Sequence, residues 1–200
     1  MRAVITLWLA IATVIFIGAC SSYSHTENDK PLSLTVGEGF TNPLGYYEGT
    51  PRFSWRPSLN SGKSTRQSAY QIQVASTVED LMNNPDKWDS GKIESASMAW
   101  VEYNGKEIAS RDKIFWRVRF WDEHNVPSKW SDVAEIEMGL LENADWKASW
   151  IGANETKATA PVSQSILATP QYFRKQFFVD KKVVKARLYV TAKGVFKVYL

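Results

Sequence analysis

The sequence predicts an all-β fold. From Pro31 onward, short runs that alternate apolar and polar residues follow one another, separated by Gly, Pro, Asn and Ser. No strand–helix unit repeats along the chain. The longest alternating run, "KIFWRVRFW" over 113–121, keeps its period across nine residues. Roughly seven short strands in about 110 residues favour a β-sandwich.

The first expected strands lie at 32–36, 52–55 and 69–76, with a Gly/Pro-rich connection over 37–51 and a loop over 58–68. Side chains alternate across a strand, so Phe53 and Trp55 share one face of theirs. In "AYQIQVAS" the same rule points Tyr70, Ile72 and Val74 inward and Gln71 and Gln73 outward.

The pattern then breaks at "STVEDLMNNPDKW". Ser76 and Thr77, followed three residues later by acids, predict the start of a short helical turn, and the Asn-Asn-Pro run ends it. Further strands are expected at 89–95, 98–103, 113–121 and 131–139. In the last of these, Val133 is out of phase with Ile136, which predicts a bulge or register break. These elements define a sandwich domain over 31–140.

Residues 141–170 are predicted to be a linker and the entry to a second domain, because they are polar and rich in Ala, Thr, Ser and Pro after "WIG". Strands are expected to resume within 171–200, at "QYFRKQFFV", "VVKARLYVTA" and "GVFKVYL". In the second run, Val184, Ala186, Leu188 and Val190 share a face. Two or three strands bury too little apolar surface to stand alone, so we expect 171–200 to be the truncated beginning of a β domain.

The N-terminus predicts export. Arg2 precedes a short apolar run that ends in "Ile17-Gly18-Ala19-Cys20", which resembles the lipobox of bacterial lipoproteins. The resemblance implies a signal peptide over 1–19, a lipid on Cys20 and a flexible polar tether over 20–30. Ser21 in place of Asp favours the outer membrane, with the periplasmic or surface orientation left open. The alternative is an uncleaved anchor with an incidental cysteine.

Several segments together resemble bacterial α-L-rhamnosidases of glycoside hydrolase family 78. They are "NPLGYYEGTPRFSW", "QSAYQIQVAS", "WDSGKIES", "FWRVRFWDEHNVPSKWSD", "DWKASWIG" and "YFRKQFFVDKKVVKARLYVTAKGVFKVYL". The resemblance implies a fibronectin type III-like (immunoglobulin-like) sandwich followed by a jelly-roll-like β domain. The family's catalytic (α/α)₆ barrel lies further along the polypeptide.

Family members hydrolyse terminal α-L-rhamnose with inversion, by a carboxylic acid and a carboxylate that flank the bond. The resemblance places both in the barrel, so it implies no catalytic residue in this sequence. Its implied partners are the downstream barrel, rhamnose-containing glycans and, through Cys20, the bacterial membrane. The alternative is a non-catalytic surface lipoprotein whose sandwich binds a glycan or a protein.

Composition and motifs exclude other classes. The net charge is +3 and Lys and Arg do not cluster, which argues against a nucleic-acid partner. Two histidines and one cysteine give no metal-ligand spacing, and no cofactor-binding motif occurs. Asp122 and Glu123 are adjacent in a turn, and we expect a solvated loop rather than a catalytic pair.

The tryptophans of "KIFWRVRFWDEHNVPSKWSD" raise the remaining question. Trp116, like Trp55, lies on an apolar strand face and is assigned to the core. Trp121 shares the opposite face with Arg117 and Arg119, and Trp130 lies in "SKWS", which resembles half of the Trp-Ser-x-Trp-Ser element of cytokine-receptor domains. These four residues predict either an Arg–Trp stack or an open sugar platform, and the stack is favoured.

Overall fold

The computed structural model describes residues 30–58, 66–152 and 171–199. The predicted signal peptide, Cys20 and all of the tether before Lys30 lie outside these residues, as does most of the linker. Within the described ranges, no helix is long and apolar enough to cross a membrane.

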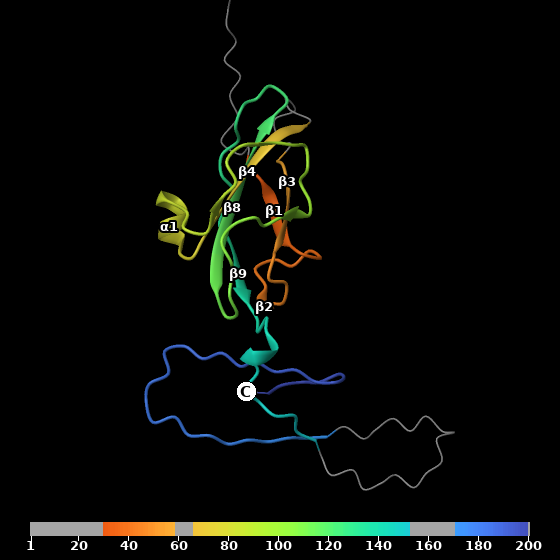
Figure 1. The fold of residues 1–200 in the computed structure, drawn as a ribbon, viewed down its shortest axis with the longest axis vertical. Helices are drawn as coiled ribbons and strands as arrows, with labels where there is room; N and C mark the ends of the chain where they lie inside the picture. Colours follow the sequence, from red (N-terminus) through yellow and green to blue (C-terminus); the bar gives the residue numbers. More distant parts are fainter. Residues whose placement is uncertain (1–29, 59–65, 153–170, 200) are drawn as a thin grey trace, which may run out of the picture.

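Two sheets pack face to face, with β4 (Gln67–Ala75) and β8 (Lys113–Asp122) running along the length of the domain (Figure 1). The smaller sheet has the order β1-β3-β7, from β1 (Leu32–Val36), β3 (Arg52–Arg56) and β7 (Val101–Glu102). The larger has the order β2-β9-β8-β4-β5, with β6 also paired to β4. Its strands are β2 (Leu44–Tyr46), β4 (Gln67–Ala75), β5 (Trp88–Asp89), β6 (Ile93–Glu94), β8 (Lys113–Asp122) and β9 (Ala134–Met138). The predicted immunoglobulin-like sandwich is confirmed.

Aromatic rings fill the space between the sheets. The rings of Phe53 and Trp116 lie 4.5 Å apart between centroids. Trp55 and Trp116 are 3% and 1% exposed, so both core assignments are confirmed. The Trp55 indole N–H, which would be costly to bury unpaired, donates to Gln67 Oε1 at 3.0 Å. Burying each of these rings contributes about 2–3 kcal/mol.

A short helix joins β4 to β5 at one side of the larger sheet. Helix α1 (Val78–Asn83) has Thr77 as its N-cap, whose hydroxyl accepts from the backbone N–H of Asp80 at 3.0 Å. The predicted start is confirmed, because the side chain pairs one of the N–H groups that a first turn leaves free. Leu81 is fully buried and fastens the helix to the sandwich.

One strand was missed. The segment 37–51, expected to be a connection, contains β2, which pairs in parallel with β9. Gly45 within it has φ +80°, a conformation that glycine adopts freely. A Cβ on Gly139 would lie 3.1 Å from the Gly45 carbonyl oxygen, so the two backbones pass close together there. A three-residue parallel edge leaves no alternation in the sequence to reveal it.

The register break expected at Val133 is confirmed. Between the pairs Trp116↔Ala134 and Trp121↔Pro127, β8 advances by five residues and the facing segment by seven. Val133 therefore lies outside the regular ladder, which begins at Ala134.

The strands expected beyond Gly139 are not formed in the part of 171–199 that the structure describes. Residues 143–145 form a 3₁₀ turn, η1 (Asn143–Asp145), and 171–199 run as an irregular trace beyond the β2 and β9 end of the sandwich (Figure 1). Most residues of 171–199 are exposed, and Tyr189 is partly buried. The alternating pattern in this segment needs a facing layer to become a sheet, and the sandwich provides none.

Candidate functional site

The outer face of β8 carries stacked cations and rings. The Arg117 and Arg119 guanidinium carbons lie 4.5 and 4.7 Å from the ring centroid of Trp130. Arg119 also lies 4.8 Å from the Trp121 centroid, and Lys92 Nζ lies 5.3 Å from that same ring. We call these five residues, Lys92, Trp121, Arg119, Trp130 and Arg117, the Arg–Trp ladder.

Trp130 reaches the ladder because of the segment that carries it. Ser128 and Ser131 each use their hydroxyl and their backbone against β8: the hydroxyls accept from Phe120 N and Val118 N at 3.0 and 3.1 Å. Their own N–H groups donate to the carbonyls of the same two residues at 2.8 and 2.9 Å. A spacing of three is the period of a polyproline II helix, so both serines face the strand and Trp130 is left over its outer face.

Two glutamines of β4 hold the arginines from beneath. Gln73 Oε1 accepts from Arg117 Nε and Nη2 at 2.9 and 2.7 Å, and Gln71 Oε1 accepts from Arg119 at 3.0 and 2.7 Å. The two glutamine amides donate in turn to the two carboxylate oxygens of Asp89 at 2.7 and 2.6 Å. One carboxylate on β5 therefore orients both guanidinium groups through two amides.

This network also covers the two glutamines. Gln71 and Gln73 face outward from the core, as expected, but they are only 8% and 9% exposed, because the ladder covers them. Partial burial lowers the pKa of both Arg117 and Arg119, although an arginine remains charged at any physiological pH.

The geometry of the ladder is that of a stack. Both rings have a cation over them, and Trp121 is only 8% exposed, which leaves little ring surface for a sugar. Each contact of this kind contributes about 0.5–1 kcal/mol at a partly exposed site. The ladder can thus fasten the segment after the β8 turn to the sheet.

The turn after β8 departs from expectation at Asp122. The prediction of a solvated loop was wrong for this residue, which is fully buried, while Glu123 is exposed. Asp122 Oδ1 accepts from the backbone N–H of His124 and Val126 at 2.9 and 2.8 Å, whereas Glu123 Oε2 accepts from Arg66 N at 3.1 Å. The two acids therefore have separate structural roles in the turn and beside β4.

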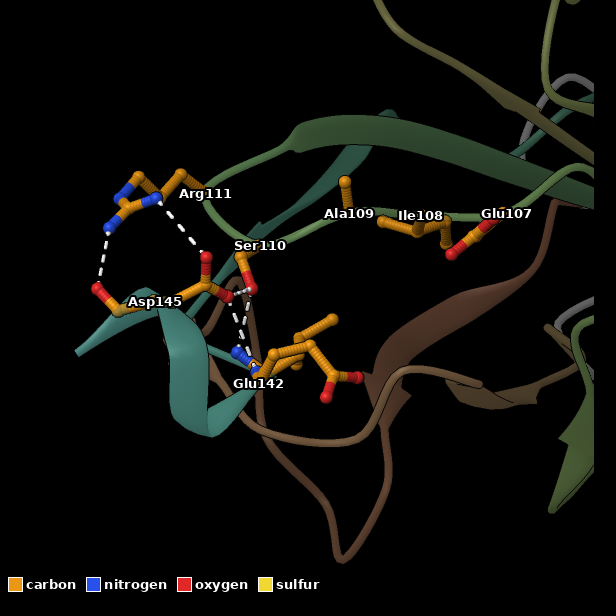
Figure 2. A pocket seen from close by; sticks show the side chains of 8 residues that line it. Glu107, Ile108, Ala109, Ser110, Arg111, Glu142 and Asp145 are labelled. Atoms are coloured by element: carbon orange, nitrogen blue, oxygen red, sulfur yellow. Dashed lines mark hydrogen bonds and ion pairs between the residues drawn. The ribbon is translucent and has the colours of Figure 1, made fainter.

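A shallow cleft of about 250 Å³ lies at the opposite end of β8, between the 107–111 loop and the residues that follow β9 (Figure 2). Asp145 sits at its edge, where its carboxylate accepts from the Ser110 hydroxyl and lies 3.7 Å from Arg111 Nη1. The Ser110 hydrogen bond is the main reason that the pKa of Asp145 is lowered. Ser110 Oγ also accepts from Leu141 N at 2.8 Å. These bonds tie the chain after β9 to the sandwich.

Trp100 is a feature that the sequence analysis did not single out. Trp100 is 50% exposed. The guanidinium carbon of Arg52, on β3, lies 4.4 Å from the centroid of the Trp100 ring. The φ of Trp100 is +58°, unusual for a bulky residue, and its N–H donates to Ser54 Oγ at 3.1 Å. The alternation in "MAWVEY", with Val101 inward, could have indicated that this ring points outward.

No group of three potential metal ligands occurs among the residues that the structure describes. The fold is an immunoglobulin-like sandwich, and the arginines on its outer face contact tryptophan rings and glutamine amides of the same domain. A family profile, "Rha78A-like, N-terminal immunoglobulin domain", matches residues 31–142, and the chain belongs to this family.

Relatives place the domain in a larger context. The chain is 69% identical to an α-L-rhamnosidase of Alteromonas sp. (strain LOR) over 200 residues, and 45% identical to one of Formosa agariphila over 185 residues. These matches cover 100% and 92% of this chain, which spans only 22% and 20% of the relatives' lengths.

Two solved α-L-rhamnosidase structures also match this chain. A crystal structure of Streptomyces avermitilis α-L-rhamnosidase complexed with L-rhamnose matches with a TM-score of 0.57 and 40% identity. The α-L-rhamnosidase from Dictyoglumus thermophilum matches with a TM-score of 0.58 and 39% identity. Each match covers 62% of this chain, and 12% and 14% respectively of the solved chains. The matched region is thus a small part of each larger protein.

Proposed function

We propose that this chain is the non-catalytic N-terminal region of an exported α-L-rhamnosidase of glycoside hydrolase family 78. The observation that carries the proposal is the family match over 31–142, in a chain that spans 22% of a relative 69% identical to it. In this proposal the sandwich supports a catalytic domain further along the same polypeptide, and that domain supplies both carboxyl groups for the hydrolysis of terminal α-L-rhamnose.

The test has two arms. The purified chain should release no rhamnose from an aryl α-L-rhamnoside, and turnover by this chain would contradict the assignment of catalysis to a downstream domain. Reading the gene beyond the codon for Leu200 should show several hundred further codons with the apolar periodicity of a helical barrel. A stop codon soon after Leu200 would favour a free-standing binding module instead.

The membrane attachment is a second part of the proposal. The apolar run and "Ile17-Gly18-Ala19-Cys20" support cleavage before Cys20, a lipid on its sulfur and residence at the outer membrane. Cells that express Cys20→Ser and are fed a radiolabelled fatty acid should yield an unlabelled precursor, whereas the unaltered chain should be labelled. Label on the Cys20→Ser chain would refute the anchor.

A glycan-binding role for the sandwich is the second candidate, and the exposed ring of Trp100 favours it. One ring face lies against Arg52, whose Nη2 is held by Glu48 at 2.6 Å, and a half-exposed tryptophan can stack on a pyranose ring. Titration of a rhamnose-containing oligosaccharide should perturb the Trp100 indole signal if this role exists. The Trp100→Ala chain supplies the control, and an unperturbed signal would exclude the role.

A further inference from the structure

The segment 171–199 touches the sandwich through a reciprocal pair of contacts. Arg187 Nε and Nη2 donate to the two carboxylate oxygens of Glu137 on β9, at 2.6 and 2.5 Å. From the sandwich side, the Arg111 guanidinium carbon lies 5.5 Å from the ring centroid of Tyr189. The segment thus supplies one arginine to the sandwich, and the sandwich supplies one arginine to the segment. Both contacts lie at the end of the sandwich where β9 leads into the following chain.

The side chains that form the ion pair are largely shielded from solvent. The side chain of Glu137 is only 10% exposed and that of Arg187 is 31% exposed, in a segment whose other residues are almost all open to solvent. A buried carboxylate is costly unless it is paired, and a bidentate guanidinium is the partner that fits it best. Tyr189 is also partly buried.

Arg111 is itself held in place on the sandwich. Its φ is +69°, its N–H donates to the Gly139 carbonyl at 3.0 Å, and its Nη2 donates to the Asp145 carbonyl at 3.2 Å. The 107–111 loop and η1, which Figure 2 shows side by side, therefore present this guanidinium toward the following segment.

The sequence pattern assigns the two faces of the segment. Arg187 and Tyr189 are two residues apart, so in an extended chain they share a face. Leu188 and Val190 fall on the other face and are 54% and 46% exposed. The face toward the sandwich is polar, and the apolar face stays available for packing within a second β domain.

We propose that the β9 end of the sandwich is a docking surface for the segment around Arg187–Tyr189 of the same chain, with Glu137 and Arg111 as its two recognition residues. This surface would fix the orientation of whatever follows relative to the sandwich. The inference goes beyond the proposed function and does not depend on which reaction, if any, the whole protein catalyses.

Chymotrypsin tests the contact on the full chain, because it cuts after both Tyr189 and Phe178. Phe178 is 94% exposed in the same segment and serves as the internal reference. The cleavage rate at each site in the folded chain is divided by the cleavage rate at the same site in denaturant. This ratio removes the preference of chymotrypsin for one local sequence over the other. We expect Tyr189 to be protected about fivefold relative to Phe178, since protection follows the closed population.

Glu137→Gln, Arg187→Glu and Arg111→Gln should each reduce this protection, while Glu137→Arg combined with Arg187→Glu should restore part of it. Arg174→Glu makes the same charge change at an exposed arginine of the segment and should leave protection unchanged. Tryptophan fluorescence verifies that each sandwich remains folded. Equal cleavage at Tyr189 and Phe178 in the unaltered chain, or failure of the reversed pair to recover protection, would overturn the proposal.

Discussion

At the scale of single residues, Asp89 has more influence than its position on a two-residue strand suggests. Its two carboxylate oxygens accept from Gln71 and Gln73, and those amides present their oxygens to Arg119 and Arg117. Burial alone would raise the pKa of Asp89, but the hydrogen bonds from the two glutamines outweigh it and lower the pKa. The charge on this carboxylate is therefore coupled to both arginines of the ladder.

Asp89→Asn should lower the free energy of unfolding by about 1 kcal/mol. An asparagine side chain offers one acceptor and one donor group, so one glutamine amide must lose its partner or flip away from its arginine. Urea denaturation followed by tryptophan fluorescence measures the change. Glu94→Gln, which neutralises an exposed β6 carboxylate paired with Lys92, should change the free energy of unfolding by less than about 0.5 kcal/mol.

The stability of the sandwich should also fall in acid. Burial tends to raise the pKa of Asp86, yet hydrogen bonds from the Ser76 hydroxyl and N–H lower it, as the glutamines do for Asp89. A group with a lowered folded pKa adds stability that is complete above its unfolded pKa, about 3.9, and is lost as pH falls through the folded pKa. The melting temperature should therefore hold near neutral pH and drop below about pH 4. Asp89→Asn should show a smaller drop, and an equal drop would contradict the role given to Asp89.

At the scale of elements, the segment between β8 and β9 is held by side chains where a regular ladder is absent. Ser128 and Ser131 place hydroxyls on β8 amides that are buried. The register break at Val133 is the consequence, because the segment changes from the three-residue period of the serines to the two-residue period of β9.

Ser128→Ala and Ser131→Ala should each cost about 1–2 kcal/mol of unfolding free energy, since each leaves a buried backbone N–H of β8 without its acceptor. Hydrogen exchange at the Phe120 and Val118 amides should quicken in the corresponding variant. Ser95→Ala removes a hydroxyl that accepts from an exposed amide, and should cost less than about 0.5 kcal/mol. Losses of equal size at all three serines would argue against this account.

At the scale of the whole molecule, the sandwich and the segment 171–199 differ in how they are held. The sandwich has a continuous core of aromatic and aliphatic side chains, whereas the segment contacts it chiefly through Arg187 and Tyr189. A domain buries enough surface to fold alone when such a core is complete. The sandwich should therefore be the cooperative unit of this chain.

Removing residues 171–200 should lower the melting temperature of the sandwich by no more than about 5 °C, because one partly exposed ion pair contributes about 1 kcal/mol or less. Differential scanning calorimetry of the shortened and full chains measures this directly. A much larger drop, or loss of the cooperative transition, would show that the segment is part of the sandwich core.

Much of the sandwich could be read from the sequence because burial imposes local rules there. The alternation of "KIFWRVRFW" placed Trp116 in the core and Arg117, Arg119 and Trp121 on the other face, and the spacing around Thr77 located α1. The parallel pairing of β2 with β9, and the full burial of Asp122, depend on residues that are distant in sequence or on turn geometry, and no local period reports them.

The sequence by itself determined the sandwich, its core tryptophans and the shared outer face of Arg117, Arg119 and Trp121, because periodicity follows directly from which face is buried. Only the tertiary structure decided how the ladder is supported. Asp89 lies on β5 and acts on the arginines of β8 through the glutamines of β4, which lies between these two strands. Ser128 and Ser131 likewise bond to amides of another element, β8. It likewise decided that Glu137 faces Arg187, 50 residues further along the chain. Such contacts depend on chain folding in three dimensions, which places distant charges together without leaving a period in the sequence.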